Sequence, residues 1–142
     1  MNKMTAAIVG GIVGTAVMTG FMMVSPALGF PEVNPAEMMA GMMEIPIVAG
    51  WGIHFIVGIV FALGFAVLII NWLENISSNI LKGVIFGLIA WVVAQSAFMG
   101  MGAVTQALPG PPPEGIAMMM TGSALNHIVF GIVVTMFVKL EK

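Results

Sequence analysis

Four long apolar stretches divide this chain into alternating hydrophobic and polar segments. They run over residues 4–28, 48–72, 80–101 and 118–138, and Lys82 is the one charged residue inside them. Each stretch holds about 20 residues or more, enough for a helix rising 1.5 Å per residue to cross a hydrocarbon core of ~30 Å. The pattern predicts an all-α fold, an integral membrane four-helix bundle that forms a single transmembrane domain over residues 1–142.

The composition supports the membrane assignment and excludes several classes of function. Mean hydropathy is +1.11 and only 7% of residues are charged, far from the usual balance of a soluble domain. The net charge is −2 and there is no arginine, so we expect the lipid bilayer and not nucleic acid as a partner. The chain has no cysteine, which excludes disulfides, thiolate metal sites and thiol catalysis.

The lysines predict an orientation in the membrane. Lys3, Lys82, Lys139 and Lys142 all fall on the side that holds both termini and the connection between the second and third stretches. The other two connections carry glutamate but no basic residue. By the positive-inside rule, a multi-pass protein with both termini in the cytoplasm is expected.

A short helix is predicted in the first outer connection, at about residues 35–45. Asn34 is a capping residue, Pro35 suits a first helical turn and Glu37 follows at the third position. Four methionines in this segment share one face at helical spacing, which predicts a helix lying at the membrane surface. They are Met38, Met39, Met42 and Met43.

An internal repeat links the two halves of the chain. The phrase His-x-x-x-Gly-Ile-Val begins at His54 and again at His127, 73 residues later, and these are the two histidines of the chain. At the same offset Gly10 and Gly14 match Gly83 and Gly87. We therefore expect two similar helical hairpins related as a parallel internal repeat. The first stretch has the features of a signal peptide, but its matched glycines favour a retained helix.

His54 and His127 are the leading candidates for a functional site. Ionisable side chains inside a membrane are costly to bury, so each marks a candidate site. The repeat puts both at a similar depth from the outer side, where polar groups from other stretches also occur: Thr19, Gln95, Ser96 and Asn126. For either histidine alone, a purely structural hydrogen bond inside the bundle remains an alternative.

Haem b is the cofactor that this layout favours first. His54 and His127 would be axial ligands, and four glycines would border the planar ring: Gly14, Gly58, Gly87 and Gly131. The layout resembles the haem-bearing four-helix core of membrane b-type cytochromes over about 90 residues. It departs from that family in having one histidine per ligand helix and no arginine for the propionates.

Copper is the second candidate, since imidazole and thioether ligands select Cu(I). His54, His127, Met22 and Met99 are the residues that would bind it, and the chain holds 15 methionines. Methionine is also a flexible apolar filler, so packing explains these residues as well. Further alternatives are a quinone site, a proton relay, and a cofactor-free structural subunit or homo-oligomer. An enzyme is not expected, because every acidic residue lies in a loop or near a terminus.

The whole chain resembles a family of uncharacterised small four-span bacterial membrane proteins. Three segments carry the resemblance: Gly10-Gly-Ile-Val-Gly14-Thr-x-x-Met18, Asn34-Pro-Ala-Glu-Met-Met-Ala-Gly-Met42, and Gly50-Trp-x-x-His54. The resemblance implies a bacterial inner-membrane location and no particular ligand residues. Together with the histidines, it leads us to expect an accessory electron-transfer protein that associates with a respiratory membrane complex or with itself.

Overall fold

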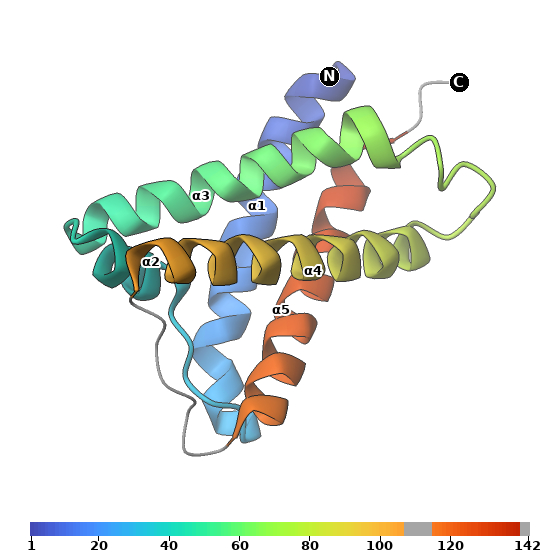
Figure 1. Ribbon diagram of the computed structural model, residues 1–142. Coiled ribbons are helices and arrows are strands. Elements are labelled where there is room, and N and C mark those ends of the chain that lie inside the picture. Colours follow the sequence, from blue (N-terminus) through green and yellow to red (C-terminus); the bar gives the residue numbers. More distant parts are fainter. Residues whose placement is uncertain (107–114, 140–142) are drawn as a thin grey trace.

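The structure is a computed structural model that describes residues 1–106 and 115–139. The described part is helical and has no β-strand, which confirms the predicted all-α fold. Four helices are long and apolar enough to cross a membrane (Figure 1). The elements are α1 (Lys3–Val24) with a 3-10 extension (Ser25–Leu28), α2 (Pro35–Met43), α3 (Ile47–Gly64) with a π-helical extension (Phe65–Ile69), α4 (Asn79–Thr105) and α5 (Ile116–Phe137).

Three of the helices begin at side-chain caps. The Asn2 side chain accepts a hydrogen bond from the backbone N–H of Thr5 at 2.8 Å, and the Ser78 hydroxyl caps α4 by accepting from Leu81 at 3.3 Å. Asn34 accepts from two backbone N–H groups at the start of α2, as its sequence predicts. These caps set where the chain enters each helix.

The predicted ends of two long helices are wrong by a few residues. The second was expected to continue to residue 72, but its regular turns end at Ile69 after a π-helical turn in which the Ile70 N–H donates to Phe65 at 2.9 Å. The third was expected to end at 101, yet α4 continues through four more residues despite the glycine at position 102. It ends at Thr105, where Gln106 takes a left-handed conformation with φ 56°.

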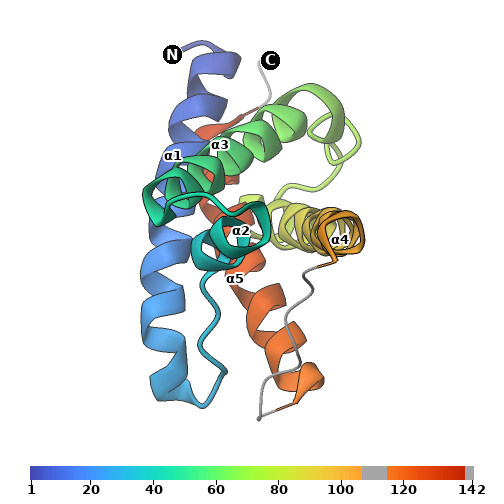
Figure 2. The ribbon, with the colours of Figure 1, turned by 60° about the vertical axis from the view of Figure 1, so that its left-hand side comes forward.

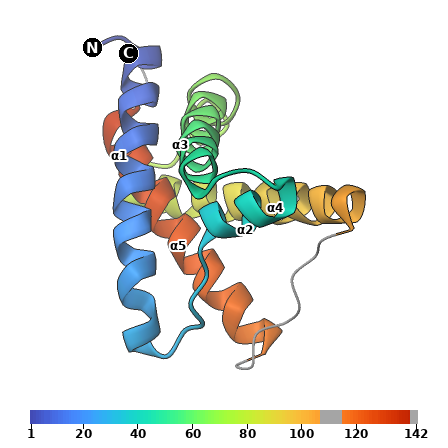
Figure 3. The ribbon, with the colours of Figure 1, turned by 90° about the vertical axis from the view of Figure 1, so that its left-hand side faces the viewer.

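The four long helices are not all aligned with one another. Helices α1 and α5 are antiparallel neighbours, whereas α3 and α4 cross them steeply (Figures 1 and 3). The main contacts join α1 to α3, α1 to α5, and α4 to α5. A helix of 27 residues such as α4 is ~40 Å long, so it can span a ~30 Å core while strongly tilted.

Three aromatic rings join the ends of three helices in the core. Phe65, Phe86 and Phe130 come from the extension of α3, from α4 and from α5, and their side chains are almost fully buried. The ring centroids of Phe65 and Phe86 are 4.6 Å apart, and those of Phe86 and Phe130 are 5.9 Å apart. This cluster ties the two halves of the chain together.

The outer surface of the bundle is apolar. In α4 only 17% of the most hydrophobic 18-residue window is buried, so most of its valines, leucines and isoleucines face outward. A helix that is apolar all round suits lipid and not water. The four helices are therefore compatible with a multi-pass membrane protein.

The short helix α2 packs on α3 through two alanines. A side chain at Gly50 would overlap the backbone of Ala36 and touch Ala40, so the two helices approach closely there. Met42 is buried, whereas Met43 is 45% exposed. A short helix is present at Pro35–Met43, within the expected residues 35–45, but its methionines do not share one environment.

The helix contacts of the two repeat halves match only in part. The contact residues on α3 and α5 are equivalent in the repeat, whereas those on α1 and α4 are shifted by one position. A Cβ at Gly11 would meet Ile59 of α3, and a Cβ at Gly83 would meet Ile132 of α5. Ile59 and Ile132 are 73 residues apart, as the repeat requires, but Gly83 is matched in sequence by Gly10. Helix α1 contacts both α3 and α5. Its Gly10 faces α5, so the neighbouring Gly11 makes the close contact with α3.

Candidate functional site

His54 occupies a stripe of small residues on α3. The buried residues of this helix recur every four positions, at Gly50, His54, Gly58 and Ala62. Spacing of four residues keeps them on one helix face. His54 is therefore the one large polar side chain in a face otherwise shaped for close helix contact, and it is 7% exposed.

The His54 ring faces α1 and is flanked by aromatic rings. Its Nε2 lies 3.5 Å from the Thr19 hydroxyl, a long contact at the outer limit of a hydrogen bond. Trp51 and Phe55 contact it edge-on, with ring centroids at 5.9 and 6.2 Å. The ring is held in place, but its polar atoms are only weakly satisfied.

His127 makes a shorter and more informative hydrogen bond. Its Nδ1 lies 2.8 Å from the backbone carbonyl oxygen of Ser123, one turn earlier on α5. A carbonyl oxygen only accepts, so in the neutral ring Nδ1 carries the proton and Nε2 offers a lone pair. Metal-binding histidines donate their second N–H to a carbonyl or carboxylate in the same way, so the Nε2 lone pair is free for a ligand or a hydrogen bond.

Helix α1 places both histidine regions at one level of the bundle. A Cβ at Gly14 would contact Phe130 of α5. Because α1 and α5 are antiparallel (Figure 2), the next turn of α1 at Met18 comes level with the preceding turn of α5 at Asn126. Thr19, which contacts the His54 ring, adjoins Met18 in sequence.

The position of His127 follows from that of Asn126. Asn126 immediately precedes His127, so the level that it shares with Met18 and Thr19 is also the level of the second histidine. His54 contacts Thr19, so both histidines lie near the same part of α1.

Two buried polar atoms in the described residues lack a hydrogen-bond partner. They are the Oδ1 atom of Asn126 and the Nε1 atom of Trp91. Asn126 is 7% exposed and adjoins His127. An unsatisfied polar atom in a dry interior costs about 1–3 kcal/mol, so a polar group or ion that bound near Asn126 would recover part of that cost.

The space beside the four glycines expected to border a porphyrin is filled by protein. They are Gly14, Gly58, Gly87 and Gly131. A Cβ at Gly58 would overlap the Thr15 hydroxyl, and a Cβ at Gly131 would overlap the backbone of Gly83. Their absent side chains let helices approach each other, the common use of such residues in membranes.

The two methionines expected as metal ligands lie in different environments. Met22 of α1 is 8% exposed and follows Thr19 by one turn, so it belongs to the same region as His54. Met99 of α4 is 63% exposed and is not gathered with the histidines. Met18, which sequence reasoning did not select as a ligand, is 7% exposed and lies at the level of the site.

A second polar contact joins α4 to α5, about two helical turns before His127 on α5. The Gln95 amide donates to the Met120 sulfur at 3.2 Å. Met120, Ser123 and His127 follow one another on one face of α5. Of these residues, Ser123 was missed by sequence reasoning, although a residue four positions before a helical histidine is where a backbone acceptor is expected.

The chain matches a family model along nearly its whole length. Residues 1–141 match DUF6789, a family of unknown function. The chain belongs to this family. No curated protein and no solved structure matches it. The expected membership of a family of small membrane proteins without an assigned activity is thus confirmed in this form, and the chemistry of the site has to be argued from the residues.

Proposed function

We propose that this member of DUF6789 is an integral membrane protein that binds one Cu(I) ion between His54 and His127. The observation that carries the proposal is the His127 ring, whose Nδ1 is 2.8 Å from the Ser123 carbonyl oxygen. That bond directs the remaining lone pair to Nε2 and fixes the ring, as in known metal ligands. His54 lies at the same level and supplies the second imidazole.

The donor set favours a soft monovalent ion. The described spans offer imidazole and thioether groups near the site, with Met18 and Met22 both buried on α1. They offer no carboxylate or thiolate there, and no group of three or more His, Cys, Asp or Glu comes together in the described residues. Imidazole with thioether suits Cu(I), and a single charge costs less to bury than a double charge.

The close contacts of the glycines favour copper over haem b, which was the first expectation from the sequence. A porphyrin needs a slot beside both histidines, and the glycines that were to border it instead meet neighbouring helices at van der Waals distance or closer. A metal ion needs no slot. An electron-transfer role requires a redox cofactor such as haem or copper. The metal-binding experiment below therefore also tests that role.

We place the histidine site in the outer half of a bacterial inner membrane, with both termini in the cytoplasm. This location rests on the lysines, which gather at the opposite end of the helices, and on the four apolar spans. The helices leave extensive apolar surface uncovered. Self-association, or docking on a membrane complex as an accessory subunit, would use that surface.

Anaerobic titration of the detergent-purified chain with Cu(I), against a competing chromogenic chelator, tests the proposal. Wild-type protein should bind about one ion per chain, and His54→Ala and His127→Ala should each weaken binding by at least about tenfold. Met22→Leu should weaken it, while Met99→Leu is the matched control that leaves it unchanged. Size-exclusion profiles establish that each variant is folded.

Three results would overturn the copper assignment. A Soret band in the purified wild-type protein, lost in both histidine variants, would assign haem. Equal copper binding by wild type and both histidine variants would place the ion elsewhere. No chromophore and no copper binding would leave the histidines as structural groups of a cofactor-free subunit.

A further inference from the structure

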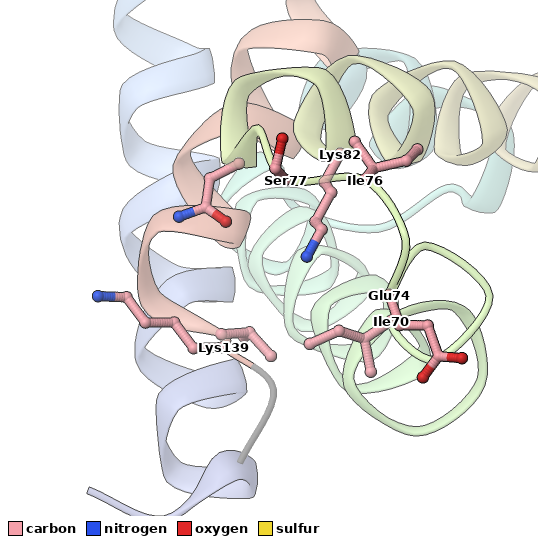
Figure 4. Close-up of a pocket in the computed structure, with 8 residues that line it drawn as sticks. Ile70, Glu74, Ile76, Ser77, Lys82 and Lys139 are labelled. Atoms are coloured by element: carbon pink, nitrogen blue, oxygen red, sulfur yellow. The ribbon is translucent and has the colours of Figure 1, made fainter. Parts of the chain in front are cut away.

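A second polar site lies at the opposite end of the molecule from the outer connections. A cavity of about 440 Å³ opens where the connection between α3 and α4 meets the end of α5 (Figure 4). Its lining combines two lysines, one glutamate, two small polar residues and three apolar residues. They are Ile70, Glu74, Ile76, Ser77, Asn79, Lys82, Val138 and Lys139.

We propose that this cavity binds the phosphate group of an anionic membrane lipid. Figure 4 shows the Lys82 side chain pointing into the space between Ser77 and Ile70. Lys82 is half-buried on the first turn of α4, and Lys139 follows the end of α5. In Figure 4 the Lys82 ammonium points into the cavity, whereas the Lys139 ammonium and the Glu74 carboxylate point away from it, so Lys82 supplies the positive charge inside. Basic pockets between membrane helices are suited to anionic headgroups.

The walls of the cavity are held together by contacts between α4 and α5. The Thr135 hydroxyl lies 2.9 Å from the backbone oxygen of Asn79 and 2.9 Å from that of Ile132 on its own helix, and its donation to Asn79 joins the start of α4 to the last turns of α5. Gly83, one residue after Lys82, packs against the backbone of Ile132. The cavity is thus formed by packed elements, and Lys82 projects from a fixed turn.

The surroundings favour a lipid over a free anion. Ile70, Ile76 and Val138 give the cavity an apolar side. Outside it, Ile80 is 64% exposed and Leu81 49% exposed, next to Lys82 on α4. Trp72, an interface residue by type, is 80% exposed in the same connection. A phosphate near Lys82 could therefore continue into acyl chains along exposed apolar surface.

The test compares lipid binding by charge-matched lysine variants of the full chain. Native mass spectrometry of detergent-purified protein with phosphatidylglycerol, and separately with phosphatidylcholine, gives the lipid affinities. Lys82→Gln should weaken phosphatidylglycerol binding about fivefold, with Lys139→Gln acting in the same direction. Lys3→Gln makes the same charge change outside the cavity and should leave binding unchanged. Lys82→Arg keeps the charge and should preserve binding.

Each alternative has its own signature. If Lys82→Gln and Lys3→Gln lost the same amount of phosphatidylglycerol affinity, the effect would come from overall charge alone. That result would overturn the site. Inorganic phosphate at millimolar concentration that displaces the lipid completely, and binds with the same dependence on Lys82, would assign a free phosphate instead. Equal affinity for phosphatidylcholine and phosphatidylglycerol would also overturn the proposal. None of these outcomes depends on whether His54 and His127 bind copper.

Discussion

Thr19 of α1 and His54 of α3 meet inside the bundle, with the threonine hydroxyl 3.5 Å from the imidazole Nε2. A distance at this limit makes a weak bond. By contrast, the Thr135 hydroxyl lies 2.9 Å from the backbone oxygen of Asn79 on another helix. The two threonines therefore provide a matched comparison of polar contacts between helices.

Thr135→Val should destabilise the protein more than Thr19→Val. Hydrogen bonds between membrane helices average about 0.6 kcal/mol and reach about 1.7 kcal/mol, so we expect Thr135→Val near the upper end of that range and Thr19→Val below 0.6 kcal/mol. Reversible unfolding in mixed micelles measures both. A larger loss for Thr19→Val would mean that its hydroxyl forms a stronger bond to His54 than the distance indicates.

Gly58→Ala should be severely destabilising, whereas Gly52→Ala on the same helix should be tolerated. A Cβ at Gly58 would overlap the Thr15 hydroxyl, while a Cβ at Gly52 would have no heavy atom within 4 Å. Overpacking costs about 1–3 kcal/mol or more, and Ala favours an exposed helix by about 1 kcal/mol relative to Gly. Thermal melting monitored by fluorescence size-exclusion chromatography compares them. Similar melting temperatures for the two variants would contradict the close contact.

Much of the architecture was readable from the sequence because it depends on local signals. The four spans follow from apolar length, and the start of α2 follows from Asn34 and Pro35, whose capping chemistry acts over one turn. The π-helical turn at Phe65–Ile69 was not predicted. Its Phe65 packs against Phe86 from another helix, a contact that a local sequence pattern does not contain.

The candidate site was predictable in its histidines but not in their surroundings. The repeat singles out His54 and His127 without a structure. It cannot show which side of α1 meets which neighbour, so Gly58 was taken as a ligand wall although Thr15 fills that space. Burial also separates Met22 from Met99, which sequence spacing alone treats alike. These distinctions arise from helix crossing, which a one-dimensional pattern does not contain.

The orientation of the chain can be measured by cysteine labelling. Glu37 on α2 and Ser77 between α3 and α4 are exposed and lie at opposite ends of the spans. Glu37→Cys should react with a membrane-impermeant thiol reagent in intact spheroplasts, and Ser77→Cys only after lysis, because Lys3, Lys82 and Lys139 favour a cytoplasmic location for their side. The cysteine-free wild type is the blank. The opposite labelling pattern would invert the topology and move the histidine site to the cytoplasmic half.

Ser123→Ala should leave metal binding intact even though Ser123 bonds to His127. The acceptor of the imidazole N–H is the backbone oxygen of Ser123, which alanine retains. We expect a copper affinity within about twofold of wild type, against the loss of at least about tenfold for His127→Ala. A tenfold loss in Ser123→Ala would show that the hydroxyl itself takes part in the site.

Asn126→Leu distinguishes a ligand site from a structural core. The Oδ1 atom of Asn126 is buried without a hydrogen-bond partner among the described residues, and such an atom costs about 1–3 kcal/mol. In metal-free protein the leucine variant should therefore be at least as stable as wild type, because it removes that cost while keeping a similar volume.

With Cu(I) present, wild type should gain more thermal stability than the Asn126→Leu variant if Asn126 supports the bound ion or its polar surroundings. Melting curves with and without Cu(I) give both differences. A variant that is destabilised in the metal-free state would indicate that Asn126 already has a partner inside the bundle, and its polar side chain would then belong to the packing of α5 and not to a ligand site.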